Sequence, residues 1–254
     1  MDTTSPAPVI ATWQVVPGPD GLPLRCWWAR PADRPARAAL LVLPEVFGLN
    51  GWVRGVAERL AAAGYAALAM PIFARTAPDL DVGYDEAGLT EGRRHRDAVT
   101  ATTFLADAEH ALAWLQQQPG LAGPVGCIGF CFGGHLALLA ATLPAVAACV
   151  DCYGARVSSF RPGGGPPTLD LLPEVAGHLL CLTGEADPLM PLEERQAISE
   201  ALARDGAARP QLQRTHLQLA GACHGFLCEA RADFHPEAAA QGWAALLEFF
   251  ARHL

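Results

Sequence analysis

A cysteine between two glycines, an acid and a histidine could together perform nucleophilic catalysis. Cys131 lies in a G-x-C-x-G-G segment between the apolar stretch 125–130 and an apolar stretch of helical character. A turn this tight needs small residues beside its apex, and Gly129 and Gly133 provide them. We predict a nucleophile elbow with Cys in place of the usual Ser, and the helix dipole behind it favours the thiolate.

The acid that completes such a site is expected after a later strand than the nucleophile. Asp187 lies in the loop after the apolar stretch 179–182 and is the preferred candidate. Glu185 competes with it from the same loop, while Asp151 and Asp170 are weaker candidates at a strand end and in an irregular segment.

The base is expected after the last strand, so that three loops meet at the carboxyl edge of one sheet. His224 follows the apolar stretch that ends near Leu219 and has this position in the chain. His135 follows the elbow but lies inside its helix, where we expect the ring to point away from Cys131. The order Cys131, Asp187, His224 therefore matches nucleophile, acid and base.

The elements that must position these residues alternate between short apolar runs and stretches of helical period. The sequence predicts strands at 9–16, 22–28, 39–43, 65–70, 125–130, 146–150, 179–182 and 212–219. It predicts helices at 52–63, about 90–118, 192–203 and 236–254. This alternation indicates an α/β fold with a doubly wound, mostly parallel sheet, and the turn at 17–21 favours an antiparallel N-terminal hairpin at one sheet edge. We expect a single domain over residues 1–254.

Composition excludes several other classes of protein. The chain has 254 residues, is 51% hydrophobic and carries a net charge of −8. All 18 basic residues are Arg, which excludes a Schiff-base lysine and a Walker A lysine. An acidic chain without a basic run is expected to bind neither nucleic acid nor a membrane surface. The first residues lack a basic flank followed by an apolar run, so we expect a cytoplasmic protein with reduced thiols.

Three regions of the sequence together resemble the dienelactone hydrolase family of α/β-hydrolases. They are the segment around Glu45 (Leu-Pro-Glu-Val-Phe-Gly-Leu-Asn), the elbow around Cys131, and His224-Gly-Phe with Arg231 and Asp233 after it. The resemblance extends from about residue 13 to residue 250 and implies the α/β-hydrolase fold.

The resemblance implies a set of catalytic roles. Cys131 would attack a lactone or ester carbonyl, His224 would shuttle the proton, and Asp187 would orient His224. Glu45 would be the acidic partner of the resting thiol. The backbone N–H groups of Val46 and Phe132 would form the oxyanion hole.

The resemblance also implies a carboxylate-bearing substrate. Arg75 and Arg231 match the family's two arginines for a substrate carboxylate, and Tyr153 would line the same pocket. Phe73 stands where a Tyr is common, and the segment 76–91 diverges from the family pattern. We therefore expect a cofactor-free enzyme acting on a small anionic lactone or ester, of carboxymethylenebutenolidase type. A thioesterase or broad carboxylesterase of the same fold, and a non-catalytic binding protein, remain as alternatives, and the chain could be a monomer or a homodimer.

The remaining cysteines invite a metal or redox interpretation. Cys149 and Cys152 lie on a predicted strand with their sulfurs on opposite faces, so we expect core packing. Cys223 and Cys228 flank His224, but zinc would need two more ligands with suitable spacing. We expect no metal site, and a regulatory thiol at Cys223 or Cys228 stays open, as does the role of the loop 157–170.

Overall fold

One eight-stranded sheet organises the computed structural model, which describes residues 7–121 and 123–254. The strand order is β1-β2-β4-β3-β5-β6-β7-β8. The strands are β1 Val9–Pro17, β2 Pro23–Pro31, β3 Ala39–Leu43, β4 Ala66–Ala69, β5 Val125–Phe130, β6 Val146–Cys152, β7 His178–Gly184 and β8 Arg214–Leu219. β1 pairs antiparallel with β2, and β2 pairs antiparallel with β4, while the other neighbours are parallel. The predicted mostly parallel sheet with an antiparallel hairpin at one edge is confirmed.

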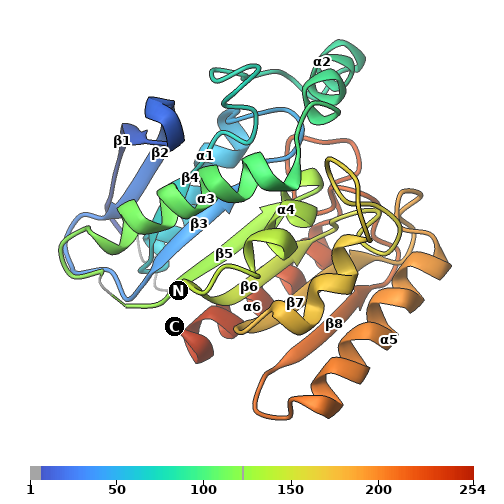
Figure 1. Cartoon of the computed structure of the whole chain (residues 1–254). Helices are drawn as coiled ribbons and strands as arrows, with labels where there is room; N and C mark the ends of the chain where they lie inside the picture. The colour runs from blue at the N-terminus through green and yellow to red at the C-terminus, as the bar shows by residue number, and fades with distance from the viewer. Residues whose placement is uncertain (1–6, 122) are drawn as a thin grey trace, which may run out of the picture.

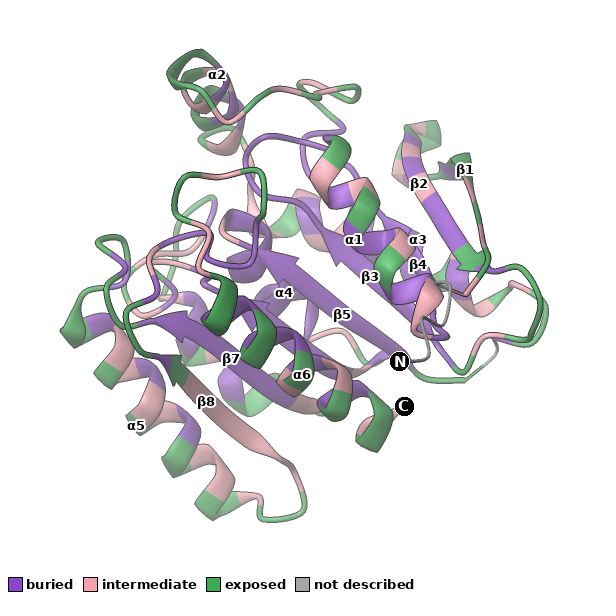
Figure 2. Cartoon of the chain, turned by 180° about the vertical axis from the view of Figure 1, so that it is seen from behind, coloured by how far each residue is buried: buried purple, intermediate pink, exposed green. Residues whose placement is uncertain are grey.

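Helices cover both faces of this sheet. They are α1 Gly51–Ala62, α2 Glu86–Arg96, α3 Ala101–Gln116, α4 Phe132–Ala140, α5 Leu192–Ala208 and α6 Pro236–His253, with short 3₁₀ turns η1 Pro19–Gly21 and η2 Thr168–Glu174. Helices α3, α4 and α5 lie on one face of the sheet, and α1 and α6 lie on the other (Figure 1). The buried side chains of each group belong to a separate apolar cluster. Every residue of β3 and β5 is buried, as expected for parallel strands covered on both faces (Figure 2).

The long helix predicted over residues 90–118 is wrong, because the structure contains two helices there. α2 ends at Arg96, and α3 begins after Thr100. The Thr100 side chain accepts a hydrogen bond from the Thr103 backbone N–H at 3.2 Å, which caps a new helix. The break lets α2 leave the sheet and lie beyond the carboxyl ends of the central strands (Figure 1).

The order of the central strands creates a crevice at the carboxyl edge of the sheet. The chain passes from β3 to β4 on one side and returns to β5 on the other side of β3. Parallel α/β sheets bind their ligands at such a switch point, because the loops after the two central strands diverge there. The loop after β3 carries Glu45 and Val46, and the turn after β5 carries Cys131.

None of the helices within the described ranges is long and apolar enough to cross a membrane.

Candidate active site

Cys131 lies at a sharp turn between β5 and α4. Its backbone φ of 55° is in the left-handed region, which a residue with a side chain seldom adopts. A Cβ at Gly129 would overlap the Gly133 carbonyl, and a Cβ at Gly133 would overlap the Pro44 carbonyl. The strand, the turn and the helix therefore approach so closely that only glycine fits at both positions. The result is an elbow that presents the Cys131 side chain at a cavity while the residues around it are buried.

His224 and Asp187 come together at the same edge of the sheet. His224 Nδ1 lies 2.7 Å from Asp187 Oδ2, and both side chains are buried. The other carboxylate oxygen of Asp187 accepts a hydrogen bond from the Leu189 backbone N–H at 2.8 Å. Both carboxylate oxygens of Asp187 therefore have a partner. Because Oδ2 is an acceptor, it places a proton on Nδ1 of His224.

The electrostatics of His224 favour its charged form. Burial lowers its pKa, but its interactions with Cys131 and Asp187 outweigh that effect and raise the pKa of His224 to about 10. An imidazole whose proton is stabilised by a neighbouring thiolate and a carboxylate is the arrangement that activates a cysteine nucleophile. His224 Nε2 is buried, has no hydrogen-bond partner within the described residues, and belongs to a side chain on the cavity wall.

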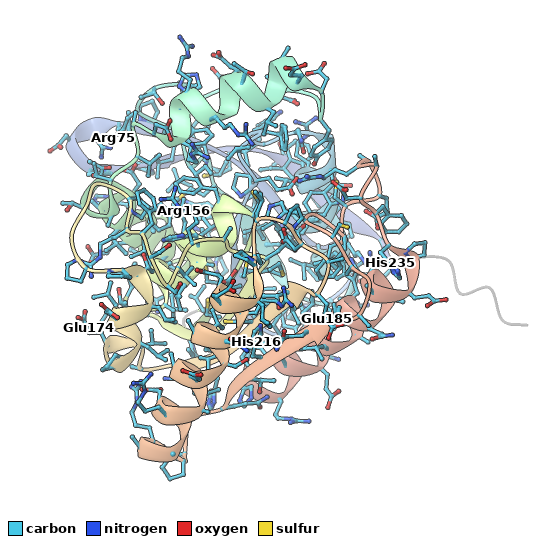
Figure 3. All side chains as sticks on the ribbon, turned by 90° about the vertical axis from the view of Figure 1, so that its right-hand side faces the viewer. Arg75, Arg156, Glu174, Glu185, His216 and His235 are labelled. Atoms are coloured by element: carbon cyan, nitrogen blue, oxygen red, sulfur yellow. The ribbon has the colours of Figure 1, made fainter. Side chains whose placement is uncertain are left out.

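The competing acids do not reach His224. Glu185, labelled in Figure 3, is exposed and is not part of the cavity wall. Asp170 is exposed in η2. Asp151 is buried, but it accepts a hydrogen bond from the Gly154 backbone N–H at 2.8 Å. Asp187 is thus the candidate that the fold brings to the imidazole.

Glu45 and Arg231 form a buried ion pair beside these residues. Arg231 Nη1 donates to Glu45 Oε1 at 3.0 Å, and the side chains are 16% and 2% exposed. Burial raises the pKa of Glu45, while Arg231 and His224 act in the opposite direction. Glu45 Oε2 is buried without a partner in the described part of the chain, so one carboxylate oxygen stays available. No hydrogen bond joins Glu45 to Cys131 in residues 7–121 and 123–254.

Two backbone N–H groups lie free at the cavity. Val46 follows β3, Phe132 is the first residue of α4, and both line the same cavity as Cys131. Neither N–H donates a hydrogen bond to another described residue. The cavity wall thus contains two residues whose backbone N–H groups have no partner among the described residues, and one of them lies at a helix N-terminus, where the dipole favours negative charge.

The cavity has a volume of about 870 Å³. Its floor is the carboxyl edge of the sheet with Cys131 and His224, and its outer wall comes from α2 and from the segment after β6. Four arginines line it, namely Arg93, Arg96, Arg156 and Arg231. Within the described ranges no group of three or more His, Cys, Asp or Glu side chains could hold a metal ion.

Two residues predicted to bind substrate lie elsewhere. Arg75 borders a separate, small pocket and donates from Nη2 to Asp107 Oδ1 at 2.7 Å. Tyr153 is fully buried, and its ring packs edge-on against His224 with the centroids 5.2 Å apart. Tyr153 therefore supports the imidazole from behind and is not among the described residues that line the main cavity.

Sequence reasoning missed several residues of the cavity wall. Tyr84, from the divergent segment, packs edge-on against Phe47 and lies 5.9 Å from the Arg231 guanidinium carbon. His135 also belongs to the cavity wall, and its ring nitrogens contact groups other than Cys131. Its Nδ1 lies 2.9 Å from the Ala155 carbonyl oxygen, its Nε2 lies 2.7 Å from Thr168 Oγ1, and burial lowers its pKa to about 4. His135 is therefore neutral with both nitrogens engaged, so His224 stays the preferred candidate for the base.

The other cysteines are reduced. Cys149 and Cys152 belong to the two opposite apolar clusters, as their positions on one strand predict. Cys228 is buried beside Tyr84 and Glu45, and burial raises its pKa to about 12. Cys223 is partly exposed next to His224.

Comparison with known proteins places the chain among hydrolases. The model of the dienelactone hydrolase family matches residues 24–254. A putative carboxymethylenebutenolidase from Synechocystis sp. is 35% identical over 216 residues, which cover 85% of this chain and 86% of that protein. A carboxymethylenebutenolidase from Pseudomonas putida is 31% identical over 222 residues, with 87% and 88% covered.

A solved structure from the same family shares the fold of this chain. The crystal structure of a putative dienelactone hydrolase from Klebsiella pneumoniae superposes with a TM-score of 0.83 at 26% identity, covering 96% of this chain and 99% of that one. The matched family, the two similar relatives and this superposition agree. The chain belongs to the dienelactone hydrolase family and is a hydrolase that acts on a lactone or ester.

Proposed function

We propose that this enzyme hydrolyses carboxylate-bearing lactones or esters through a covalent acyl intermediate on Cys131. The observation that carries the proposal is the shared cavity: Cys131 projects into it from the elbow, and His224, held at 2.7 Å by Asp187, lines the same cavity. The raised pKa of His224 supports a thiolate and imidazolium pair as the reactive form.

In the first half of the reaction, Cys131 Sγ attacks the substrate carbonyl carbon. The carbonyl oxygen becomes an oxyanion and accepts hydrogen bonds from the Val46 and Phe132 N–H groups, each of which typically lowers the barrier by about 3 kcal/mol. The tetrahedral adduct collapses as the bond to the alkoxide breaks. His224 gives its Nε2 proton to that leaving oxygen, and a thioester stays on Cys131.

In the second half, water releases the acid. His224 is neutral after the first proton transfer, so it can take a proton from a water molecule that attacks the thioester carbonyl. The C–S bond breaks, the carboxylic acid leaves, and Cys131 and His224 return to the charged pair. Asp187 stabilises the imidazolium at each stage through its contact with Nδ1.

Glu45 can regulate the protonation of the Cys131 thiol before substrate binds. Its free Oε2 is an acceptor for a thiol proton, and burial, which raises its pKa, makes it a better base than an exposed carboxylate. Arg231 holds the other oxygen, so a substrate carboxylate that draws Arg231 toward itself also changes the basicity of Glu45.

The names of the relatives support a lactone as the substrate. Carboxymethylenebutenolidase is a lactone hydrolase by name, and a Bradyrhizobium protein, 29% identical over 245 residues, is named a probable 2-oxo-3-(5-oxofuran-2-ylidene)propanoate lactonase. Both names describe furanone rings with an acidic side chain. Arg231, on the cavity wall, supplies a cation for that acid.

The test is hydrolysis of dienelactone, aryl esters and thioesters by the wild type and by Cys131→Ala. We expect turnover that disappears in Cys131→Ala, and a mass increase equal to the acyl group on the Cys131 peptide after rapid acid quenching. Cys223→Ala is the matched control, because Cys223 is a second accessible thiol near the site. Full activity in Cys131→Ala would overturn the proposal. The ratio of kcat/KM values for dienelactone and thioester decides between a lactonase and a thioesterase.

A further inference from the structure

The segment after β6 carries an arginine in an unusual backbone conformation. This segment, residues 155–167, is called the strap here, and it forms part of the cavity wall. Arg156 has a φ of 66°, in the left-handed region that favours glycine. A strained residue with a long charged side chain at a cavity indicates a role for that side chain, since glycine would fit the backbone at less cost.

The Arg156 side chain has no acidic partner. Its guanidinium carbon lies 4.6 Å from the centre of the Phe160 ring, which is also on the cavity wall. No carboxylate of the described residues forms an ion pair with Arg156. Arg156 is exposed at the cavity, its guanidinium packs against an aromatic ring, and its N–H donors form no hydrogen bond with another described residue.

A row of rings connects this arginine to the nucleophile. Phe132, the residue next to Cys131, lies 6.3 Å from the His135 ring, and His135 lies 6.0 Å from the Phe160 ring. All three residues belong to the cavity wall, with Phe132 and His135 buried in it and Phe160 partly exposed. His135 is held neutral by burial, so the row is uncharged from Phe132 to Phe160. The row ends at the Arg156 guanidinium.

The acids on the cavity wall are mostly engaged elsewhere. Asp97 binds Arg96, Asp233 lies 3.5 Å from Arg231, and Asp85 caps α2 by accepting from the Gly88 N–H. Glu86 is exposed in the first turn of α2. Arg93 on α2 and Arg156 on the strap therefore have no ion pair with an acid of the described residues, and of these two Arg156 lies at the end of the aromatic row.

We propose that Arg156 forms a second anion subsite, which binds a carboxylate or phosphate group at the far end of the substrate's acyl chain while the chain lies along Phe132, His135 and Phe160. This subsite differs from Arg231, which is paired with Glu45 beside the thiol. The volume of about 870 Å³ is near the upper end of the range for drug-sized ligands, so the cavity has room for a chain longer than a small lactone. The proposal rests on the proposed function, because it needs the acyl carbon at Cys131.

The experiment measures selectivity between charged and neutral acyl chains of equal length. The substrates are the 4-nitrophenyl monoesters of adipic and suberic acid, the neutral hexanoate and octanoate esters, and an octanoate ester with a terminal phosphate. We expect the ratio of kcat/KM for acid-ended to neutral esters to fall about tenfold in Arg156→Gln, as loss of one charge-assisted hydrogen bond predicts. Arg156→Lys should keep most of the ratio.

Arg204→Gln is the matched control, because Arg204 is exposed on α5, away from the cavity, and the substitution changes the net charge equally. We expect Arg204→Gln to leave the ratio unchanged. A larger fall for the carboxylate-ended or for the phosphate-ended ester identifies which group the subsite binds. An unchanged ratio in Arg156→Gln would overturn the subsite.

A binding measurement separates this proposal from the catalytic one. Calorimetry with monomethyl suberate, in the Cys131→Ala protein with and without Arg156→Gln, requires no turnover. About tenfold weaker binding in the double variant supports the subsite even if Cys131→Ala turns out to hydrolyse esters. Equal binding in the two proteins would exclude it, whatever the nucleophile is.

Discussion

Arg231 Nη1 donates a hydrogen bond of 3.0 Å to Oε1 of Glu45, whose side chain is almost fully buried. The two residues are 186 positions apart in the sequence, and they join the loop after β3 to the loop after β8. The pair therefore ties together two sides of the cavity that carries Cys131.

Removing the charge of one member of this pair should lower the free energy of unfolding more than removing both charges. Arg231→Gln leaves the Glu45 carboxylate buried without its cation, so we expect the free energy of unfolding to fall by about 3 kcal/mol. Adding Glu45→Gln should recover part of that loss, because the uncompensated charge disappears. Urea denaturation of the four proteins in the cycle measures the coupling.

The exposed Arg252–Glu248 pair provides the control for this cycle. Arg252→Gln should change the free energy of unfolding by less than about 0.5 kcal/mol. Strictly additive effects of Arg231→Gln and Glu45→Gln would contradict a stabilising pair.

A glycine sets how closely α2 approaches the loop after β3. A Cβ at Gly92 would overlap the Val46 carbonyl oxygen. Gly92→Ala should therefore displace α2 or the Val46 peptide and lower the free energy of unfolding by about 1–3 kcal/mol. It should also reduce kcat, because the proposed mechanism uses the Val46 N–H to bind the oxyanion. Ester hydrolysis and thermal denaturation measure both effects.

Gly55 is the control for Gly92. It is exposed in α1, and a methyl group added there would meet no neighbouring side chain or segment within 4 Å. Gly55→Ala should raise the free energy of unfolding by about 0.5–1 kcal/mol through helix propensity and leave kcat unchanged. An unaltered kcat in Gly92→Ala would show that the helix tolerates the extra methyl group without moving Val46.

Asp151 should make stability depend on pH. Its carboxyl is buried, and burial raises its pKa to about 7, above the value near 3.9 expected in the unfolded chain. The native state thus holds a proton that the unfolded state releases, so the contribution of Asp151 is complete below about pH 4 and is lost as the pH rises to about 7.

Asp151→Asn keeps an oxygen acceptor for the Gly154 N–H and removes this titration. The full difference in pKa corresponds to something on the order of 4 kcal/mol. We expect the fall in the free energy of unfolding between pH 4 and pH 7 to be smaller in Asp151→Asn than in the wild type. Parallel pH profiles for the two proteins would contradict a protonated Asp151.

At position 156 we expect a glycine variant to be more stable than an alanine variant, which is the reverse of the order inside a helix. Because φ is 66° there, Arg156→Gly should be more stable than Arg156→Ala by about 1 kcal/mol. At Arg204, inside α5, the order should be reversed by a similar amount. Thermal denaturation of the four variants gives the comparison, and the same order at both positions would mean that Arg156 is not strained.

The placement of Cys131, Asp187 and His224 at one edge of the sheet could be predicted because the sequence signals for these residues are local. Cys131, Asp187 and His224 each follow an apolar strand and stand beside turn residues, and a parallel sheet brings such loops to one edge. The roles assigned to these residues stay predictions until Cys131→Ala is measured.

The outer wall of the cavity could not be predicted in the same way. Arg156 and Tyr84 reach the cavity only because the strap and the segment before α2 fold back over the sheet, and no pattern in their own sequence specifies that path. Arg75 matched a motif, yet its contact with Asp107 holds it in a different pocket. The break at Thr100 was not predicted because residues 90–98 are almost all polar, so they carry no apolar period that could show where one helix ends and the next begins.

α2 and the strap form a rim that is separate from the strand ends (Figure 1). Apart from Gly92, which packs on Val46, the exposed positions of these two segments can change without touching the strand-end turns. The fold is thus a practical starting point for directed evolution, in which libraries confined to those positions would sample new specificities while the elbow at Cys131 stays unchanged.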